Sequence, residues 1–330
     1  MFFCLDKNKC IFKKCKDKYA LRKKYNERIF QCLSLTHSLK IQMINRIRNN
    51  RSLAPFILNI ELTDYCPLHC KQCYKKLEST YLEWNRLVAL INEARDIGVK
   101  KILLSGGEPL CYPFVFEAIQ MIKQYGMYAF MSSSGSNMDA QTIQKLKESK
   151  IDIIYLSLNG STKQINELSR DGYDTVMNAM SVFKTASISF RVNWVARADN
   201  LLDFPRLIEL CKEKGAEGID VLSNKPNVNG VMDSPLDRQQ LHELYSMCQE
   251  NDPYVQIQSC FYQLKELFPT YRKTFFEGCL AGKASMAVFA DGTFSICPHI
   301  YGNKTWGSIM EFWESCKNIK NDGYCKLQKR

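Results

Sequence analysis

The sequence lacks several features that would place it in a well-defined protein class. It has no run of about 18 apolar residues, the length that a membrane-spanning helix needs. Its first residues show neither an uninterrupted apolar stretch of signal-peptide length nor a small-residue cleavage site. No repeat occurs at the periods of solenoids or propellers. With 45% hydrophobic and 24% charged residues, the composition also excludes a disordered or collagen-like chain. We therefore expect a cytoplasmic globular protein with no membrane partner.

Cysteine, by contrast, is abundant, with 15 residues in a chain of 330. This density is below that of small secreted scaffolds held together by disulfides, and a chain of this length does not need such bonds. In a reducing compartment, many cysteines indicate metal or redox chemistry.

Strand-like runs alternate with helical segments in the first two thirds of the chain. The strand-like runs cover residues 56–62, 101–105, 127–133, 152–158, 188–195 and 218–222. The helical segments between them cover residues 82–97, 114–125, 140–148, 175–185 and 204–214. This pattern predicts an α/β fold, a partial (β/α)6 TIM-like barrel built from right-handed parallel βα units. Functional residues are then expected at the carboxyl ends of the strands.

The alternation stops near Asn224, where a stretch rich in Asn, Pro and Gly predicts a loop. Later elements are expected at residues 236–250 (helix), 284–289 and 293–296 (strands, with a turn at Asp291-Gly292) and 309–315 (helix). We interpret this tail as a small C-terminal α+β subdomain. The expected parts are a basic, partly helical extension (1–53), the barrel (54–223), and the linker helix with its subdomain (224–330).

Two sequences at expected strand ends carry the chemistry. Cys66, Cys70 and Cys73 are spaced CxxxCxxC directly after the first strand. A structural zinc site normally needs four ligands from two paired clusters, whereas three thiolates on one loop suit a [4Fe–4S] cluster with one open iron. The second strand ends in Gly106-Gly107-Glu108-Pro109. Its glycines let the backbone approach a ligand closely, and Glu108 can accept a hydrogen bond from an ammonium group.

Together these two sequences resemble the radical S-adenosylmethionine (SAM) enzymes. Their signature is CxxxCxxC with an aromatic residue before the last cysteine; this chain has Gln72 there and Tyr74 one position later. The resemblance implies that Cys66, Cys70 and Cys73 hold the cluster and that SAM chelates its fourth iron. Reductive cleavage of SAM would then yield a radical that abstracts hydrogen from a substrate. The GGEP sequence would meet the amino group of SAM.

The resemblance implies further SAM contacts at later strand ends. Ser157-Leu158-Asn159-Gly160 is similar to the SLDG of the family, with Asn159 in place of the usual aspartate. The candidate SAM-binding residues from this comparison are Ser133, Ser157, Asn159, Arg170 and Asn193. Taken singly, a serine at a strand end is more often a cap or turn residue, and an arginine at a helix end a solvated ion pair.

The tail resembles part of a SPASM or twitch extension, whose β-hairpin binds an auxiliary [4Fe–4S] cluster. Twelve residues separate Cys279 from Gly292, and four separate Gly292 from Cys297. A hairpin turned by Asp-Gly would bring its two flanking thiols together. Either Cys316 and Cys325 complete one cluster in a shortened, twitch-like form, or one iron stays open to substrate; zinc or inert buried thiols are the alternatives.

The resemblance implies a ribosomally made precursor peptide as substrate and a flavodoxin or ferredoxin as reductant. Sulfatase maturation and small-molecule or cofactor biosynthesis are alternatives within the same family. Four cysteines have no motif: Cys111, Cys211, Cys248 and Cys260. They would pack as small hydrophobes; the alternative is donation of a hydrogen atom to a substrate radical, for which Cys211, Cys248 and Cys260 are the candidates.

The net charge of +11 lies in the N-terminal extension. Residues 1–53 hold 14 Lys and Arg against 3 Asp and Glu, and the remainder of the chain is balanced. The extension is either a solvated segment packed on the barrel or a dock for an acidic partner, such as a peptide leader. A metal-bearing nucleic-acid-binding protein is the alternative of another class. No nucleic-acid motif accompanies the basic residues, so nucleic acid is not an expected partner.

Overall fold

The computed structural model describes residues 52–258, 260–261 and 279–316. Its centre is a curved sheet in the order β7-β6-β5-β4-β3-β2-β1-β8-β9, in which every neighbouring pair is parallel except β8 and β9. The first six strands are β1 (Ile57–Thr63), β2 (Lys101–Gly106), β3 (Tyr128–Ser133), β4 (Ile153–Ser157), β5 (Phe190–Ala196) and β6 (Ile219–Ser223). The partial α/β barrel is confirmed, and it is not closed.

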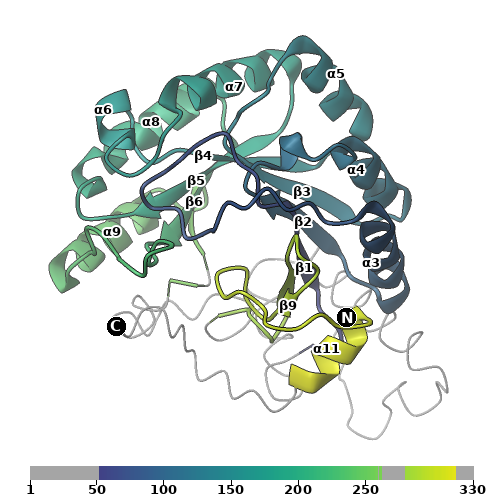
Figure 1. Ribbon diagram of the computed structural model, residues 1–330. Coiled ribbons are helices and arrows are strands. Elements are labelled where there is room, and N and C mark those ends of the chain that lie inside the picture. Colours follow the sequence, from purple (N-terminus) through teal and green to yellow (C-terminus); the bar gives the residue numbers. More distant parts are fainter. Residues whose placement is uncertain (1–51, 259, 262–278, 317–330) are drawn as a thin grey trace, which may run out of the picture.

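Helices cover the outside of this sheet, while the loop after β1 lies within its curve (Figure 1). The covering helices are α3 (Trp84–Ile97), α4 (Val115–Gln124), α5 (Ala140–Ser149), α7 (Tyr173–Ala186) and α8 (Phe204–Lys214). Short helical turns lie at η3 (Pro109–Cys111), α6 (Lys163–Asn166) and η4 (Leu201–Asp203). Local sequence sets the helix ends: the Asp139 carboxylate caps α5 by accepting a bond from Thr142 N, and Gly98 ends α3 with φ of 81°.

The hydrophobic core lies between the sheet and these helices, because alternate strand residues point outward. In β5, Val192 and Trp194 are fully buried on the helix side, and Trp194 stacks on Phe204 of α8 with ring centroids 4.0 Å apart. Asn193 between them is partly exposed on the inner face. β5 therefore carries apolar residues outward and places the polar Asn193 on the inner face.

Three strands extend the sheet beyond the six predicted for the barrel; two of them, β8 and β9, match the strands predicted in the tail, and β7 was not predicted. β7 (Val255–Ile257) pairs with β6 and follows the helix α9 (Arg238–Glu250). β8 (Ser285–Val288) pairs in parallel with β1, and β9 (Phe294–Ser295) pairs with β8. The tail strands thus continue the barrel sheet, while α11 (Ile309–Ser315) packs beside α3.

The proposed division into three parts stays a prediction, and residues 1–51 of the basic extension lie outside the described residues. Among the helices described, none combines the length and apolarity needed to cross a membrane.

Candidate functional site

The loop that carries the three cysteines leaves β1 at Thr63 and returns beside it at Thr80. The Thr63 hydroxyl donates to Thr80 O at 2.7 Å and accepts from Tyr65 N at 3.0 Å. The Asp64 carboxylate accepts a bond from Thr80 N at 2.6 Å. These bonds fasten the base of the loop to the carboxyl end of β1, where the sequence predicted a site.

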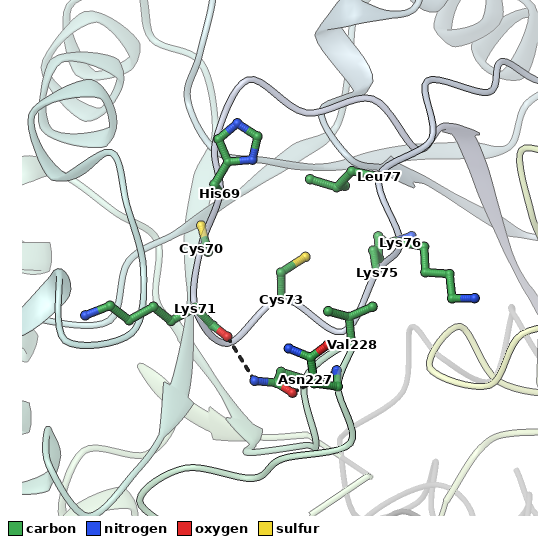
Figure 2. Close-up of a pocket in the computed structure, with 10 residues that line it drawn as sticks. His69, Cys70, Lys71, Cys73, Lys75, Lys76, Leu77, Asn227 and Val228 are labelled. Atoms are coloured by element: carbon green, nitrogen blue, oxygen red, sulfur yellow. Dashed lines mark hydrogen bonds between the residues drawn. The ribbon is translucent and has the colours of Figure 1, made fainter.

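Cys70 and Cys73 line a pocket of about 370 Å³ between this loop and residues 227–229. In Figure 2 the Cys73 sulfur points toward the middle of the pocket, while the Lys71 and Lys76 side chains point away. The loop after β6 forms the opposite wall: Val228 N donates to Cys73 O at 2.9 Å, and Asn227 Nδ2 donates to Lys71 O at 3.3 Å. The cysteine loop is therefore held between the ends of β1 and β6.

The thiols of the cysteine loop influence the pKa values of one another. Burial raises the pKa of Cys66 to about 11 and also raises that of Cys73, and Cys70 raises both further. The positive charge of Arg170 lowers the pKa of Cys66 and Cys73; its predicted contact with SAM stays a prediction. Metal coordination deprotonates a thiol outright, so these raised pKa values describe the iron-free protein.

The donor set fits an iron–sulfur cluster. Cys66, Cys70 and Cys73 are free thiols and partly exposed. No three His, Cys, Asp or Glu side chains within residues 52–258, 260–261 and 279–316 form a group that could hold one metal ion. Each thiolate of a [4Fe–4S] cluster binds a different iron, so thiols set apart on one loop are compatible with that group.

The two glycines of the GGEP sequence allow the turn after β2 to contact the backbone of the cysteine loop. A Cβ at Gly106 would lie 2.2 Å from Thr63 O, and one at Gly107 would lie 2.2 Å from Tyr65 O. Without side chains, Gly107 N donates to Thr63 O at 2.7 Å and Glu108 N donates to Tyr65 O at 2.8 Å. The GGEP turn is thus fastened directly to the backbone before Cys66.

The Glu108 carboxylate has different partners from those that the sequence suggested. It is fully buried and accepts bonds from Ser133 Oγ at 2.9 Å, Leu110 N at 3.2 Å, Ser134 N at 2.7 Å and the Ser134 hydroxyl. Burial raises the pKa of Glu108, and the bonds from Ser134 and Ser133 oppose this shift. In this structure Glu108 ties the end of β2 to the end of β3, rather than presenting a free acceptor to an ammonium group.

Other predicted cofactor residues lie on the inner face or just behind it. Ser157 and Asn193 are register partners on β4 and β5, both partly exposed, and Asn193 Nδ2 donates to Ser132 Oγ at 3.2 Å. Asn159 is buried, and its side chain bonds to Gln72 of the cysteine loop. The sequence did not indicate this last contact.

The hydrogen-donor candidates occupy two kinds of environment. Cys211 on α8 and Cys248 on α9 are buried in the hydrophobic core, and burial raises the pKa of each to about 12. Cys260 is partly exposed near the carboxyl end of β6, where Ser223 Oγ lies 3.9 Å from its sulfur. The core positions of Cys211 and Cys248 fit the role of small hydrophobes.

Three of the four tail cysteines lie within the described residues. Cys279 is partly exposed, Cys297 and Cys316 are buried, and Cys325 lies outside the described residues. The segment that follows β9 contacts the cysteine loop. The ring centroids of Tyr74 and His299 lie 4.5 Å apart, and Lys76 N donates to the Tyr301 hydroxyl at 3.2 Å.

A buried ion pair that the sequence did not indicate joins Glu61 of β1 to Lys75, which lies two residues after Cys73. Burial lowers the pKa of Lys75 to about 7. Lys75 and Lys76 are adjacent in the sequence, and no signal marks the first as buried and the second as exposed.

Comparisons with known proteins agree with this geometry. The family model described as the radical SAM superfamily matches residues 60–211. The chain is 24% identical over 291 residues to the AdoMet-dependent heme synthase of Methanosarcina barkeri, covering 80% of this chain and 83% of that protein. It is 30% identical over 175 residues to the PqqA peptide cyclase of Ruegeria pomeroyi, covering 51% of this chain and 47% of that protein.

Among solved structures, Streptococcus suis SuiB bound to precursor peptide SuiA is similar with a TM-score of 0.68 and 18% identity, covering 83% of this chain and 66% of that chain. The chain therefore spans about half the length of the peptide cyclase and about two thirds of SuiB. Residues 60–211 form a radical SAM domain, and the chain is an enzyme of the radical SAM superfamily.

Proposed function

We propose that this enzyme binds a [4Fe–4S] cluster through Cys66, Cys70 and Cys73 and cleaves SAM reductively to start hydrogen abstraction from a substrate. The observation that carries the proposal is the direct fastening of the cysteine loop to the GGEP turn by the backbone bonds of Gly107 and Glu108. Within a radical SAM domain, this contact brings the expected cluster ligands and the expected SAM-binding turn to one strand edge.

The bound cluster would supply the one-electron chemistry that cleaves SAM. The chain's own residues have simpler roles. The Arg170 guanidinium lowers the pKa of Cys66 and Cys73, and it would offset negative charge from the thiolates and from the carboxylate of SAM. Ser157 and Asn193 would present polar groups to SAM from the inner face of the barrel.

The proposed substrate is a ribosomally made peptide. Support comes from the similarity to a PqqA peptide cyclase and from the likeness in fold to SuiB, which has been solved with precursor peptide SuiA and with S-adenosylmethionine. A small molecule or cofactor precursor is the second candidate. The heme synthase favours it, because that similarity extends over most of both chains.

We also propose an auxiliary [4Fe–4S] cluster held by Cys279, Cys297, Cys316 and Cys325. The spacing around Gly292 supports it, as does the observed β8–β9 hairpin turned at Asp291-Gly292. A flavodoxin or ferredoxin is the proposed reductant, because a low-potential one-electron donor is required. The cysteine content of the sequence supports a cytoplasmic location.

Anaerobic reconstitution tests the core proposal. Wild-type protein should be brown, bind at least four irons per chain and form 5′-deoxyadenosine from SAM and dithionite. A variant with Cys66, Cys70 and Cys73 all changed to Ala should lose SAM cleavage, while the Cys111→Ala control should keep it. Iron remaining in the triple variant would support the auxiliary cluster. Colourless wild-type protein that is inert toward SAM would contradict the proposal.

A further inference from the structure

The segment from Cys70 to Cys73 has a second attachment, at the ends of β4 and β5. Gln72 N donates to Ser169 O at 3.1 Å. The Gln72 side-chain oxygen accepts a bond from Asn159 Nδ2 at 2.8 Å, and the same Asn159 Nδ2 donates to Ser169 Oγ at 2.8 Å. We call these three residues, Gln72, Asn159 and Ser169, the Gln72 clamp.

Within the protein, both side-chain amide protons of Asn159 are donated to protein acceptors. Its side-chain oxygen accepts a bond from Val195 N at 3.1 Å, and both protons of its amide nitrogen go to Gln72 and Ser169. Its backbone N donates to Asn166 Oδ1, and its carbonyl accepts bonds from Trp194 Nε1 and Asn200 Nδ2. With 1% of its surface exposed, Asn159 has no amide proton left for SAM.

Gln72 and Asn159 are also two positions at which the chain departs from the family signature. Gln72 replaces the aromatic residue and Asn159 replaces the aspartate. With an aspartate at position 159, the Gln72 amide would have to rotate and donate to the carboxylate, and an aromatic ring at position 72 would leave one Asn159 proton without its acceptor. The two departures from the family signature are therefore residues in direct contact.

We propose that the Gln72 clamp is a positioning device for the cluster: it fixes the segment Cys70–Cys73 against the ends of β4 and β5, and Asn159 does not bind SAM. The loop after β6 holds this segment from the other side, through Val228 N and Asn227 Nδ2. The clamp supplies the opposing attachment, next to Arg170, which acts on Cys66 and Cys73. The inference rests on the proposed function, because it assumes a cluster at these cysteines.

Two conservative substitutions test the contact. Gln72→Glu keeps an acceptor for Asn159 Nδ2. Asn159→Asp keeps an acceptor for Val195 N, and the Gln72 amide can rotate to donate to the new carboxylate. The double variant places two carboxylates in contact, and one of them, at position 159, lies at a buried position, so the two repel each other.

The readouts are iron per chain, the electron paramagnetic resonance spectrum of the reduced cluster with and without SAM, and the rate of 5′-deoxyadenosine formation. Each single variant should keep iron binding and SAM affinity within about threefold of wild type. In the double variant, iron per chain and the rate of 5′-deoxyadenosine formation should fall about tenfold or more below the product of the single effects.

Single effects that simply multiply in the double variant would overturn the clamp. A weakening of SAM binding by tenfold or more in Asn159→Asp alone would overturn the assignment of Asn159 as a residue that does not contact SAM. Wild-type protein that binds no cluster would instead refute the proposed function, so the two failures are distinguishable.

Discussion

Gly107→Ala is the substitution whose effect follows most directly from the geometry. The new Cβ would lie 2.2 Å from Tyr65 O, 2.5 Å from Tyr65 C and 2.6 Å from Asp64 O. All three atoms belong to the backbone, so no side-chain rotation can make room. The GGEP turn and the cysteine loop must therefore move apart.

The cost can be worked from the contacts that this movement breaks. Two backbone hydrogen bonds are lost: the one from Gly107 N to Thr63 O, which is 2.7 Å long, and the one from Glu108 N to Tyr65 O, which is 2.8 Å long. Two backbone hydrogen bonds at about 0.5–1.5 kcal/mol each, and about 1–3 kcal/mol for overpacking, give a loss of about 2–6 kcal/mol. This is a large fraction of the free energy of unfolding of a typical domain.

The free energy of unfolding is measured by urea denaturation of the full chain, together with iron bound per chain after reconstitution. Gly307→Ala is the matched control, because its Cβ would meet only the flexible end of the Glu311 side chain, at 3.1 Å. Gly107→Ala should lower both stability and iron binding, and the control should change neither by much. Equal urea midpoints and equal iron content in the two variants would show that the GGEP turn and the cysteine loop do not depend on close backbone contact at Gly107.

Two further changes test the surrounding structure. Glu108→Gln puts an amide NH₂ among the donors of Ser133, Ser134 and Leu110 and should lower the free energy of unfolding, measured by urea denaturation, by about 1–3 kcal/mol. Glu117→Gln, at an exposed position on α4, is the control. Equal free energies of unfolding in the two variants would show that these donors do not require a carboxylate. Lys101 lies 3.9 Å from the Phe130 ring centroid inside the barrel, and burial lowers its pKa to about 8 from 10.5. Between these values the unfolded chain binds more protons, so wild-type stability relative to Lys101→Met should rise from pH 8 to pH 10. A difference that falls or stays constant over this range would show that Lys101 is not held in a desolvated site.

Much of the barrel could be predicted from sequence, because strand and helix periodicity are local. β1–β6 begin and end within about two residues of the predicted runs. β7 has three residues, too few to show a period. The pairing of β8 with β1 joins residues more than 220 positions apart, and no local pattern specifies that register.

The location of the candidate site could be predicted from the sequence, but its contacts could not. The spacing of Cys66, Cys70 and Cys73 predicts a metal-binding loop after the first strand. The partners of Glu108 and the contact between Gln72 and Asn159 depend on how separate strand ends meet, and Gln72 and Asn159 are 87 positions apart. Sequence alone could name these residues as unusual, but not as partners.

In the proposed function, Cys66, Cys70 and Cys73 hold a cluster with one iron open to SAM. Electron paramagnetic resonance of the dithionite-reduced, reconstituted protein, recorded with and without SAM, tests this arrangement. The wild-type protein should show the signal of a reduced [4Fe–4S] cluster whose line shape changes when SAM is added, and the triple Cys→Ala variant should show no such SAM-dependent change. A signal that SAM leaves unchanged, or a SAM-dependent signal that persists in the triple variant, would contradict it.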